Sequence, residues 1–323
     1  MLCILYVNLV GACLGLATLL IERALPAVAL RRWIWCATLG ASLFIPGYYR
    51  NHHNWSVVGN AVAPESVDAA TSAVPLLDLR WWAQSDSYDR AINRIWLTLS
   101  AILIAWSLAN AWRVWRVIRV SRRQNGRQRT TLVDGVPVLV TDQVGPATVG
   151  LLRSRVLLPR WALALPEPLR QYVVRHEDEH RRAHDGLLLF VASLPLVLAP
   201  WNLALWWQLR RLCLAVEMDC DARVIGALGD AHTYGALLLR VAEAGSRSPH
   251  LQPAFLGTGM LERRLTQLLS PQPLRRLQRV VVPAVAIALL TLVALMPHPV
   301  SGLASHHHPT DASTPALATP EQR

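Results

Sequence analysis

Two histidines and a glutamate stand near the middle of the chain, at His176, Glu177 and His180. In a helix, four residues turn through about 400°, so both imidazoles project from one face and a single cation can contact both. This HExxH pattern is typical of metallopeptidases, in which the histidines hold zinc and the glutamate handles protons. The alternative is a charged amphipathic helix with two surface histidines.

A hydrolytic zinc site takes three protein ligands and keeps a fourth position for water, so another part of the chain must supply the third. We predict that Glu217 is this ligand, on a second helix that carries Asp221 one turn later. A carboxylate at that spacing is suited to accept the free ring N–H of a zinc-bound histidine. The alternative is an ordinary solvated acidic helix face.

Two cysteines, Cys213 and Cys220, lie one helical turn on either side of Glu217. Their thiolates are alternative zinc ligands, although cysteines of this kind are also common as small buried apolar residues. His184 does not fit the longer zinc motif that ends in a third histidine, because the required glycine and spacing are missing.

The chemistry predicted for such a site is peptide hydrolysis. Zinc lowers the pKa of its bound water towards about 7 and polarises the scissile carbonyl. Glu177 takes the proton and returns it to the departing amine, while a nearby donor stabilises the oxyanion. His232 and Tyr234 are candidate donors, and each could instead serve as a helix-start or packing residue.

Several elements must position these residues. We expect helices over Pro166–Arg182, Leu203–Ile225, Tyr234–Ala244 and Leu261–Leu269. Val136–Val140 and Arg155–Leu158 read as short strands that form a hairpin. The edge at Arg155–Leu158 is a candidate binding site for an extended substrate.

The remaining chain indicates a membrane protein. Its apolar content of 53% is concentrated in blocks, of which four are long enough to cross a bilayer about 30 Å thick. These four predicted transmembrane helices are Met1–Ile21, which we expect to be retained rather than cleaved, Trp33–Tyr49, Ile95–Trp112 and Val280–Pro297.

Charge gives the predicted orientation. The formal net charge is +11, and arginine supplies all of the positive charge because the sequence contains no lysine. The arginines cluster beside the apolar blocks, most densely between Arg113 and Arg129. Basic residues flank the cytoplasmic ends of membrane helices, so we expect residues 113–279 to form a cytoplasmic domain. Residues 1–112 are then a membrane anchor with an extracytoplasmic loop at 50–94, and residues 298–323 a disordered extracytoplasmic tail. Direct binding of nucleic acid is not expected.

A fifth uncharged run, Gly186–Leu209, contains Pro195 and Pro200. Because His180 precedes it and Glu217 follows it, a full crossing would separate ligands of one zinc ion by a membrane thickness. We predict a proline-broken hairpin that is associated with the membrane and does not cross it.

Three segments together carry a family resemblance: Gly150-Leu-Leu-Arg-Ser-Arg-Val-Leu-Leu-Pro159, the HExxH followed by Asp185, and Glu217-Met-Asp-Cys-Asp-Ala222. They resemble the BlaR/MecR membrane metallopeptidases, or antirepressors. The resemblance implies a mainly α membrane protein in which an α+β, gluzincin-like zinc domain is inserted among four transmembrane helices. It also implies His176, His180 and Glu217 as ligands, Glu177 as acid/base, and signal transduction by cleavage of a cytoplasmic repressor or of the protein itself.

One departure concerns the input signal. Family members that sense β-lactams carry a penicillin-binding domain after the last membrane helix, and we expect none in residues 298–323. Its acylation chemistry also needs a lysine, and the sequence contains no lysine. The competing functional class is a non-catalytic membrane receptor that retains the zinc fold. A metal transporter would place ionisable residues within the membrane spans, which carry almost none.

Overall fold

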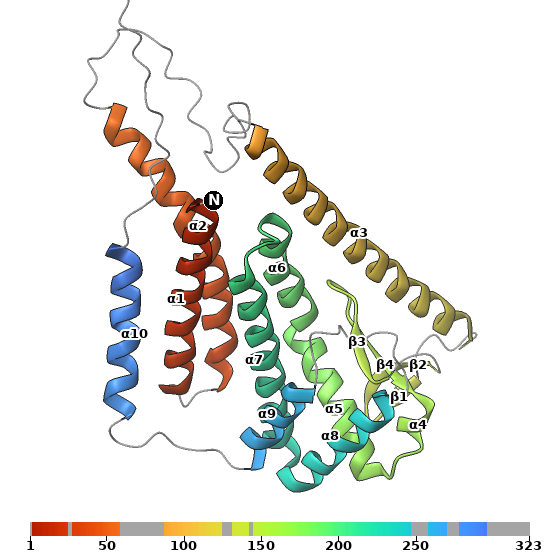
Figure 1. The fold of residues 1–323 in the computed structure, drawn as a ribbon. Helices are drawn as coiled ribbons and strands as arrows, with labels where there is room; N and C mark the ends of the chain where they lie inside the picture. Colours follow the sequence, from red (N-terminus) through yellow and green to blue (C-terminus); the bar gives the residue numbers. More distant parts are fainter. Residues whose placement is uncertain are drawn as a thin grey trace, which may run out of the picture.

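The computed structural model describes residues 2–24, 28–58, 87–124, 131–141, 145–246, 258–269 and 278–295. In these ranges the fold is mainly helical with one small mixed sheet (Figure 1). The helices are α1 (Leu2–Ala24), α2 (Val28–Val58), α3 (Ser87–Gln124), α4 (Arg160–Leu163), α5 (Glu167–Ala183), α6 (Asp185–Leu198), α7 (Leu203–Leu228), α8 (Ala231–Ser246), α9 (Thr258–Leu269) and α10 (Gln278–Leu295). The strands are β1 (Thr131–Val133), β2 (Val136–Thr141), β3 (Ala147–Val149) and β4 (Arg155–Pro159).

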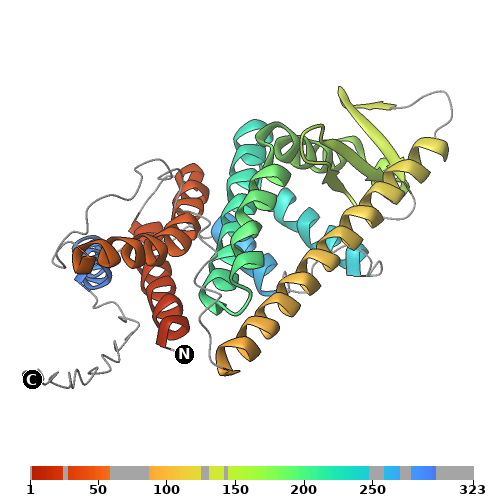
Figure 2. The same cartoon turned by 90° about the horizontal axis from the view of Figure 1, so that it is seen from above.

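Three of the helices are candidate membrane spans by length and composition, over Ile4–Ala24, Val28–Ile45 and Ala91–Ser121. The apolar part of α10, Val281–Ala294, is shorter than these spans. Helices α1, α2 and α10 stand side by side, and α3 lies on the opposite side of α6 and α7 (Figures 1 and 2). The structure therefore supports three candidate spans, and a fourth crossing by α10 stays a prediction.

The helices extend further than the apolar blocks predicted. Helix α2 continues to Val58 and α3 begins at Ser87, so both ends of the predicted 50–94 loop are helical; its centre and the 298–323 tail lie outside the described residues. Helix α3 also continues past Trp112 to Gln124. Hydropathy marks the lipid-facing part of a helix and not its polar continuation, which explains the difference.

Arginine and tryptophan alternate at helical spacing near the end of α3. The guanidinium of Arg116 lies 5.6 Å from the Trp112 ring centroid, and that of Arg119 lies 4.0 Å from the Trp115 ring centroid. Such cation–π pairs one turn apart suit a membrane boundary, where an apolar ring and a charged head share one surface.

The sheet has the order β1-β2-β4-β3, and it corrects the predicted hairpin. Strands β2 and β4 are parallel neighbours, with Val138 opposite Val156, whereas β3 pairs antiparallel with β4. The short strand β3 lies between them in sequence and reverses the chain before β4 begins. Gly150, at a φ of 104°, begins the turn that leads to β4.

The predicted hairpin at Gly186–Leu209 has the form of two helices. Helix α6 contains Pro195 and ends at Leu198, and α7 begins at Leu203 after a turn that includes Pro200. The Asn202 side chain caps α7 by accepting the backbone N–H groups of Ala204 and Leu205 at 3.0 and 3.3 Å. The turn brings α7 back against α5, so the two ligand-bearing helices become neighbours.

Two apolar cores hold this arrangement. One lies between the sheet, α5, α7 and α8, and includes Val156, Val174, Val224 and Leu237. The other lies among α2, α6 and α7, where Trp35 is fully buried and meets Trp207 edge to face at 5.7 Å between ring centroids. Helix α7 takes part in both cores and thereby joins the candidate membrane helix α2 to the part of the fold that contains the HExxH helix.

Candidate metal centre

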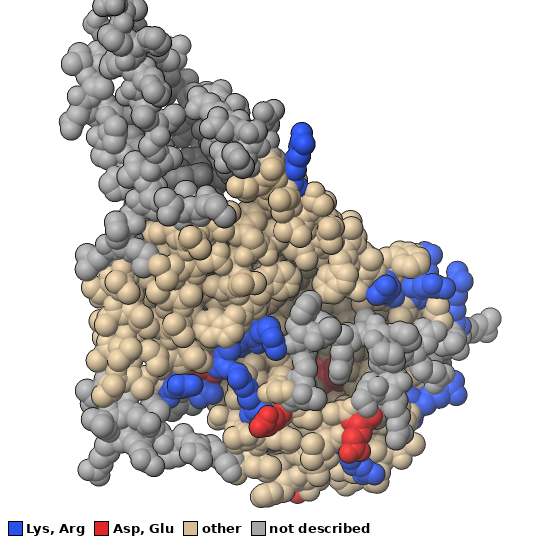
Figure 3. Space-filling view, viewed as in Figure 1, with Lys and Arg blue, Asp and Glu red and all other residues tan. Residues whose placement is uncertain are grey.

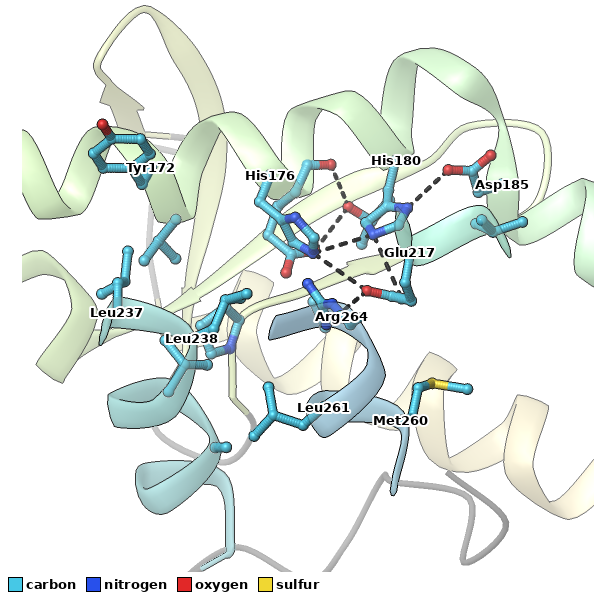
Figure 4. Close-up of a pocket in the computed structure, with 18 of the residues that line it drawn as sticks. Tyr172, His176, His180, Asp185, Glu217, Leu237, Leu238, Met260, Leu261 and Arg264 are labelled. Carbon is cyan, nitrogen blue, oxygen red and sulfur yellow. Dashed lines mark hydrogen bonds and ion pairs between the residues drawn. The ribbon is translucent and has the colours of Figure 1, made fainter. Parts of the chain in front are cut away.

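Three side chains from α5 and α7 converge at one place in the structure (Figure 4). The His176 Nε2 and His180 Nε2 atoms lie 3.3 Å apart. The Glu217 carboxylate reaches both, with Oε2 at 3.6 Å from His176 Nε2 and Oε1 at 3.7 Å from His180 Nε2. The structure thus brings together the three side chains that the sequence proposed as ligands.

This spacing fits a zinc ion. Zn–N and Zn–O bonds of about 2.0 to 2.2 Å at tetrahedral angles place ligand atoms about 3.3 to 3.6 Å apart. The three observed separations, 3.3, 3.6 and 3.7 Å, are close to that range.

The second histidine is oriented by Asp185, whose Oδ2 lies 2.8 Å from His180 Nδ1. His184 makes this contact possible, because it adopts a left-handed conformation with a φ of 55° between α5 and α6. The turn brings Asp185 back onto the imidazole, while the His184 side chain is exposed. An N–H donated from Nδ1 leaves Nε2 free as the metal-facing donor.

The first histidine is oriented through Tyr234, which stands between it and Asp221. The tyrosine hydroxyl lies 2.9 Å from His176 Nδ1 and donates to Asp221 Oδ1 at 2.7 Å. Asp221 Oδ1 itself is 3.6 Å from His176 Nδ1, which is too long for a hydrogen bond. Burial, and next the Asp221 carboxylate, raise the pKa of Tyr234, so the hydroxyl stays protonated.

A buried arginine from α9 completes this side of the site. Arg264 binds Asp221 through two N–H groups, at 2.7 and 2.8 Å, and Glu217 Oε2 at 2.9 Å. Burial opposes the ionisation of Glu217, but Arg264 and then His180 lower its pKa well below the usual range. Glu217 is therefore held as a carboxylate, the form that binds a cation.

The two cysteines differ in their surroundings. Burial, followed by the nearby Glu217, raises the pKa of Cys213 to about 12, so this thiol stays neutral. Cys220 Sγ lies 3.3 Å from His176 Nδ1, and His176, His180 and Cys220 form a possible metal-binding group among the described residues. Burial opposes a thiolate at Cys220, but His176 lowers its pKa. Cys220 therefore remains the alternative third ligand.

Anionic groups surround the two imidazoles and raise their pKa values. Burial lowers the pKa of His176, yet Cys220 and then Glu217 raise it to about 10. The pKa of His180 is raised in the same way, against burial, first by Glu217 and then by Asp185. These anionic groups favour positive charge at the imidazoles, and a divalent cation would supply it without protonation.

Glu177 lies beside the metal-binding atoms and next to the sheet. The hydroxyl of Thr148, on β3, lies 2.6 Å from the Glu177 carbonyl oxygen and 3.1 Å from Glu177 Oε2. Both residues line a cavity of about 430 Å³ that also contains His176, His180 and Glu217. Apolar side chains from α8 and α9 form another part of its wall: Leu237, Leu238, Val241, Met260 and Leu261.

The other predicted site residues have different positions. Tyr234 lines the cavity, but its hydroxyl is already engaged with Asp221 and His176. His232 is exposed in the first turn of α8 and is not among the residues that line the cavity, because its backbone N–H binds Asp230 at the helix start. The predicted substrate edge at Arg155–Leu158 is wrong, since β4 is an inner strand paired on both sides.

Sequence reasoning assigned no role to three residues that the structure places in contact with the site. Asp185 is one of them, and the only sequence feature that could have marked it is the position of a carboxylate shortly after the second histidine. Thr148 and Arg264 come from elements distant in sequence, and no local pattern marks them.

A histidine pair and a facing glutamate thus lie beside candidate membrane spans. The chain belongs to the family described as BlaR1 peptidase M56, whose sequence model matches residues 2–268. Membership of this family implies metallopeptidase activity and protein substrates. A comparison with curated proteins found no match.

Proposed function

We propose that the protein is a zinc metalloendopeptidase of the cell membrane, with His176, His180 and Glu217 as the metal ligands and Glu177 as the catalytic acid/base. The observation that carries this proposal is the convergence of the three proposed ligand side chains, whose nearest nitrogen and oxygen atoms lie 3.3 to 3.7 Å apart, in one cavity that Glu177 also lines. Zinc at this position would polarise the scissile carbonyl and activate water.

The protein groups have separate tasks in this mechanism. Glu177 accepts the proton of the attacking water and passes it to the departing amine. Thr148 holds the Glu177 carboxylate from β3, which fixes the position of the base relative to the cavity. Asp185 holds one histidine, and Tyr234 with Asp221 holds the other, so both rings keep Nε2 towards the metal.

The substrate is proposed to bind as an extended strand beside β3. This strand is an edge of the sheet, and Ala147 and Thr148 line the cavity that contains Glu177. An unpaired strand edge offers backbone N–H and C=O groups to an added strand. The apolar wall from α8 and α9 faces the same cavity and would accept apolar side chains of the substrate.

The site is proposed to face the cytoplasm. The arginine cluster at the end of α3 precedes the sheet directly, and basic flanks mark the cytoplasmic ends of membrane helices. With α10 as a fourth crossing, and the α6–α7 hairpin entering the bilayer without crossing it, three groups of arginines fall on the cytoplasmic side: Arg23, Arg31 and Arg32, the cluster between Arg113 and Arg129, and Arg275, Arg276 and Arg279. On the face drawn in Figure 3, most basic side chains of the described residues lie in the lower part of the molecule. Cleavage of a cytoplasmic repressor, or of the protein itself, would then transmit a signal from the membrane.

The test compares the wild type with Glu177→Gln, both purified in lipid nanodiscs, for zinc content, self-cleavage and hydrolysis of a quenched fluorescent peptide library. Glu167→Gln, at an exposed position on the same helix, is the matched control. We expect Glu177→Gln to keep zinc and to lose cleavage, while the control keeps both. Zinc binding without cleavage in all three proteins would instead favour the non-catalytic receptor.

A further inference from the structure

A buried ion-pair cluster links a membrane helix to the metal-binding residues. Arg32, near the start of α2, places Nη1 3.3 Å from Asp185 Oδ1 and 3.2 Å from Asp219 Oδ2. Only 4% of each aspartate side chain is exposed, and 16% of the arginine side chain. Charges this well buried interact more strongly than surface pairs, and they leave a large penalty if one partner is removed.

Both aspartates are close in structure or sequence to a proposed ligand. Asp185 uses its other oxygen, Oδ2, to hold His180 Nδ1 at 2.8 Å, as Figure 4 shows. Asp219 lies on α7, two residues after Glu217. Arg32 therefore fixes the free oxygen of the carboxylate that orients one ligand, and it also contacts the helix that carries another.

The second cation near these carboxylates is more distant. Arg223 lies 3.8 Å from Asp185 Oδ2 and 3.6 Å from Asp219 Oδ2, and it also faces Glu179 at 3.6 Å. Among the ion pairs of the described residues, loss of Arg32 would leave Asp185 with His180 and with the more distant Arg223, both at Oδ2, and would leave Oδ1 without an arginine. Rotation of the Asp185 carboxylate would then release the His180 ring from the orientation that this contact fixes.

We propose that Arg32 is a positioning residue through which the candidate membrane helix α2 sets the orientation of His180 by way of Asp185. The proposal rests on the proposed function, because it assumes that His180 is a zinc ligand. Helix α2 packs against both α6 and α7, so a shift of α2 relative to these helices would change the Arg32 contacts. Among the described residues, this is a direct contact between a candidate membrane span and a group bonded to a proposed ligand.

The test is the zinc dissociation constant of the full-length protein in nanodiscs, measured by competition with a fluorescent chelator. Outer partners of metal-bound histidines typically contribute 10- to 100-fold in affinity, and we expect Arg32→Gln to weaken zinc binding about tenfold. Arg32→Lys, which keeps the charge but not the planar fork, should lose less. Arg31→Gln is the matched control: it removes the same charge from the same helix, at a residue that lines a different cavity with Glu22 and Arg211.

A double-mutant cycle separates positioning from general destabilisation. If Arg32 acts through Asp185, adding Arg32→Gln to Asp185→Asn should change zinc affinity less than twofold beyond Asp185→Asn alone. The visible spectrum of the cobalt-loaded protein should change in the same way in both single variants. The inference would be overturned if the losses of zinc affinity in the two single variants multiply in the double variant, or if Arg32→Gln binds zinc as tightly as the wild type. If Arg32→Gln fails to fold, the same comparison with Arg32→Lys decides.

The same measurements distinguish failure of the proposed function from failure of the positioning role alone. A wild-type protein that binds no zinc would reject the metal site, and the positioning role with it. Zinc binding and cleavage by the wild type, with no effect at Arg32, would reject the positioning role alone.

Discussion

Replacing Tyr234 with phenylalanine distinguishes two roles for its hydroxyl. The sequence suggested an oxyanion donor, whereas the structure places the hydroxyl between His176 Nδ1 and Asp221, at 2.9 and 2.7 Å. Removing it leaves His176 Nδ1 with Asp221 at 3.6 Å and Cys220 Sγ at 3.3 Å. Asp221 keeps both of its bonds to Arg264, so the surrounding structure should persist.

The expected loss follows from the role of an outer hydrogen bond. Such partners contribute about 10- to 100-fold in metal affinity, or roughly 1.4 to 2.8 kcal/mol. We expect the lower end, about tenfold, because Cys220 remains within reach of the ring. The assay measures zinc affinity by chelator competition and cleavage at saturating zinc.

Tyr172→Phe is the matched control, because Tyr172 lines the same cavity but donates its hydroxyl to the Gly229 carbonyl. It should leave zinc affinity unchanged. Unchanged zinc affinity in Tyr234→Phe, with a large loss of turnover at saturating zinc, would refute the orienting role and restore the oxyanion donor.

Three further predictions address neighbouring parts of the molecule. Thr148→Val should keep zinc and lower the turnover number about tenfold, because a hydrogen bond to a charged group contributes about 1.5 to 3 kcal/mol. A turnover number equal to that of the wild type would show that Thr148 does not position Glu177. Because the pKa of Cys213 is raised to about 12, its thiol is almost fully protonated at pH 8, so alkylation of the folded protein should spare it at that pH and increase as the pH approaches the pKa. Single cysteines at Arg210 and Thr266, in a cysteine-free background, should resist a membrane-impermeant reagent added to intact cells; efficient labelling from outside would reverse the proposed topology.

The elements that carry the ligands could be predicted because their signals are local. The spacing of His176 and His180, and the apolar residues before them, predicted a helix close to the observed α5. The second helix followed from the same periodicity around Glu217. That α5 and α7 lie next to one another could be predicted only by assuming that both helices bind the same zinc ion. This assumption required the uncharged run Gly186–Leu209 between them to fold back on itself.

Other features depend on contacts that no local pattern contains. The parallel pairing of β2 with β4 arises from the three-residue strand β3, which is too short to stand out in the sequence. Asp185 reaches His180 because His184 adopts a left-handed backbone conformation that side chains rarely favour. Arg264 comes from a helix whose own sequence gives no sign that its arginine is buried against two carboxylates.

The identity of the third ligand is the most direct test of the account. Zinc K-edge X-ray absorption on the zinc-loaded Glu177→Gln protein reports the atoms bound to the metal and their distances. Ligation by His176, His180 and Glu217 predicts only nitrogen and oxygen neighbours, at about 2.0 to 2.2 Å. A sulfur neighbour at about 2.3 Å, lost in Cys220→Ser and retained in Glu217→Ala, would contradict the proposed centre and assign the metal to Cys220.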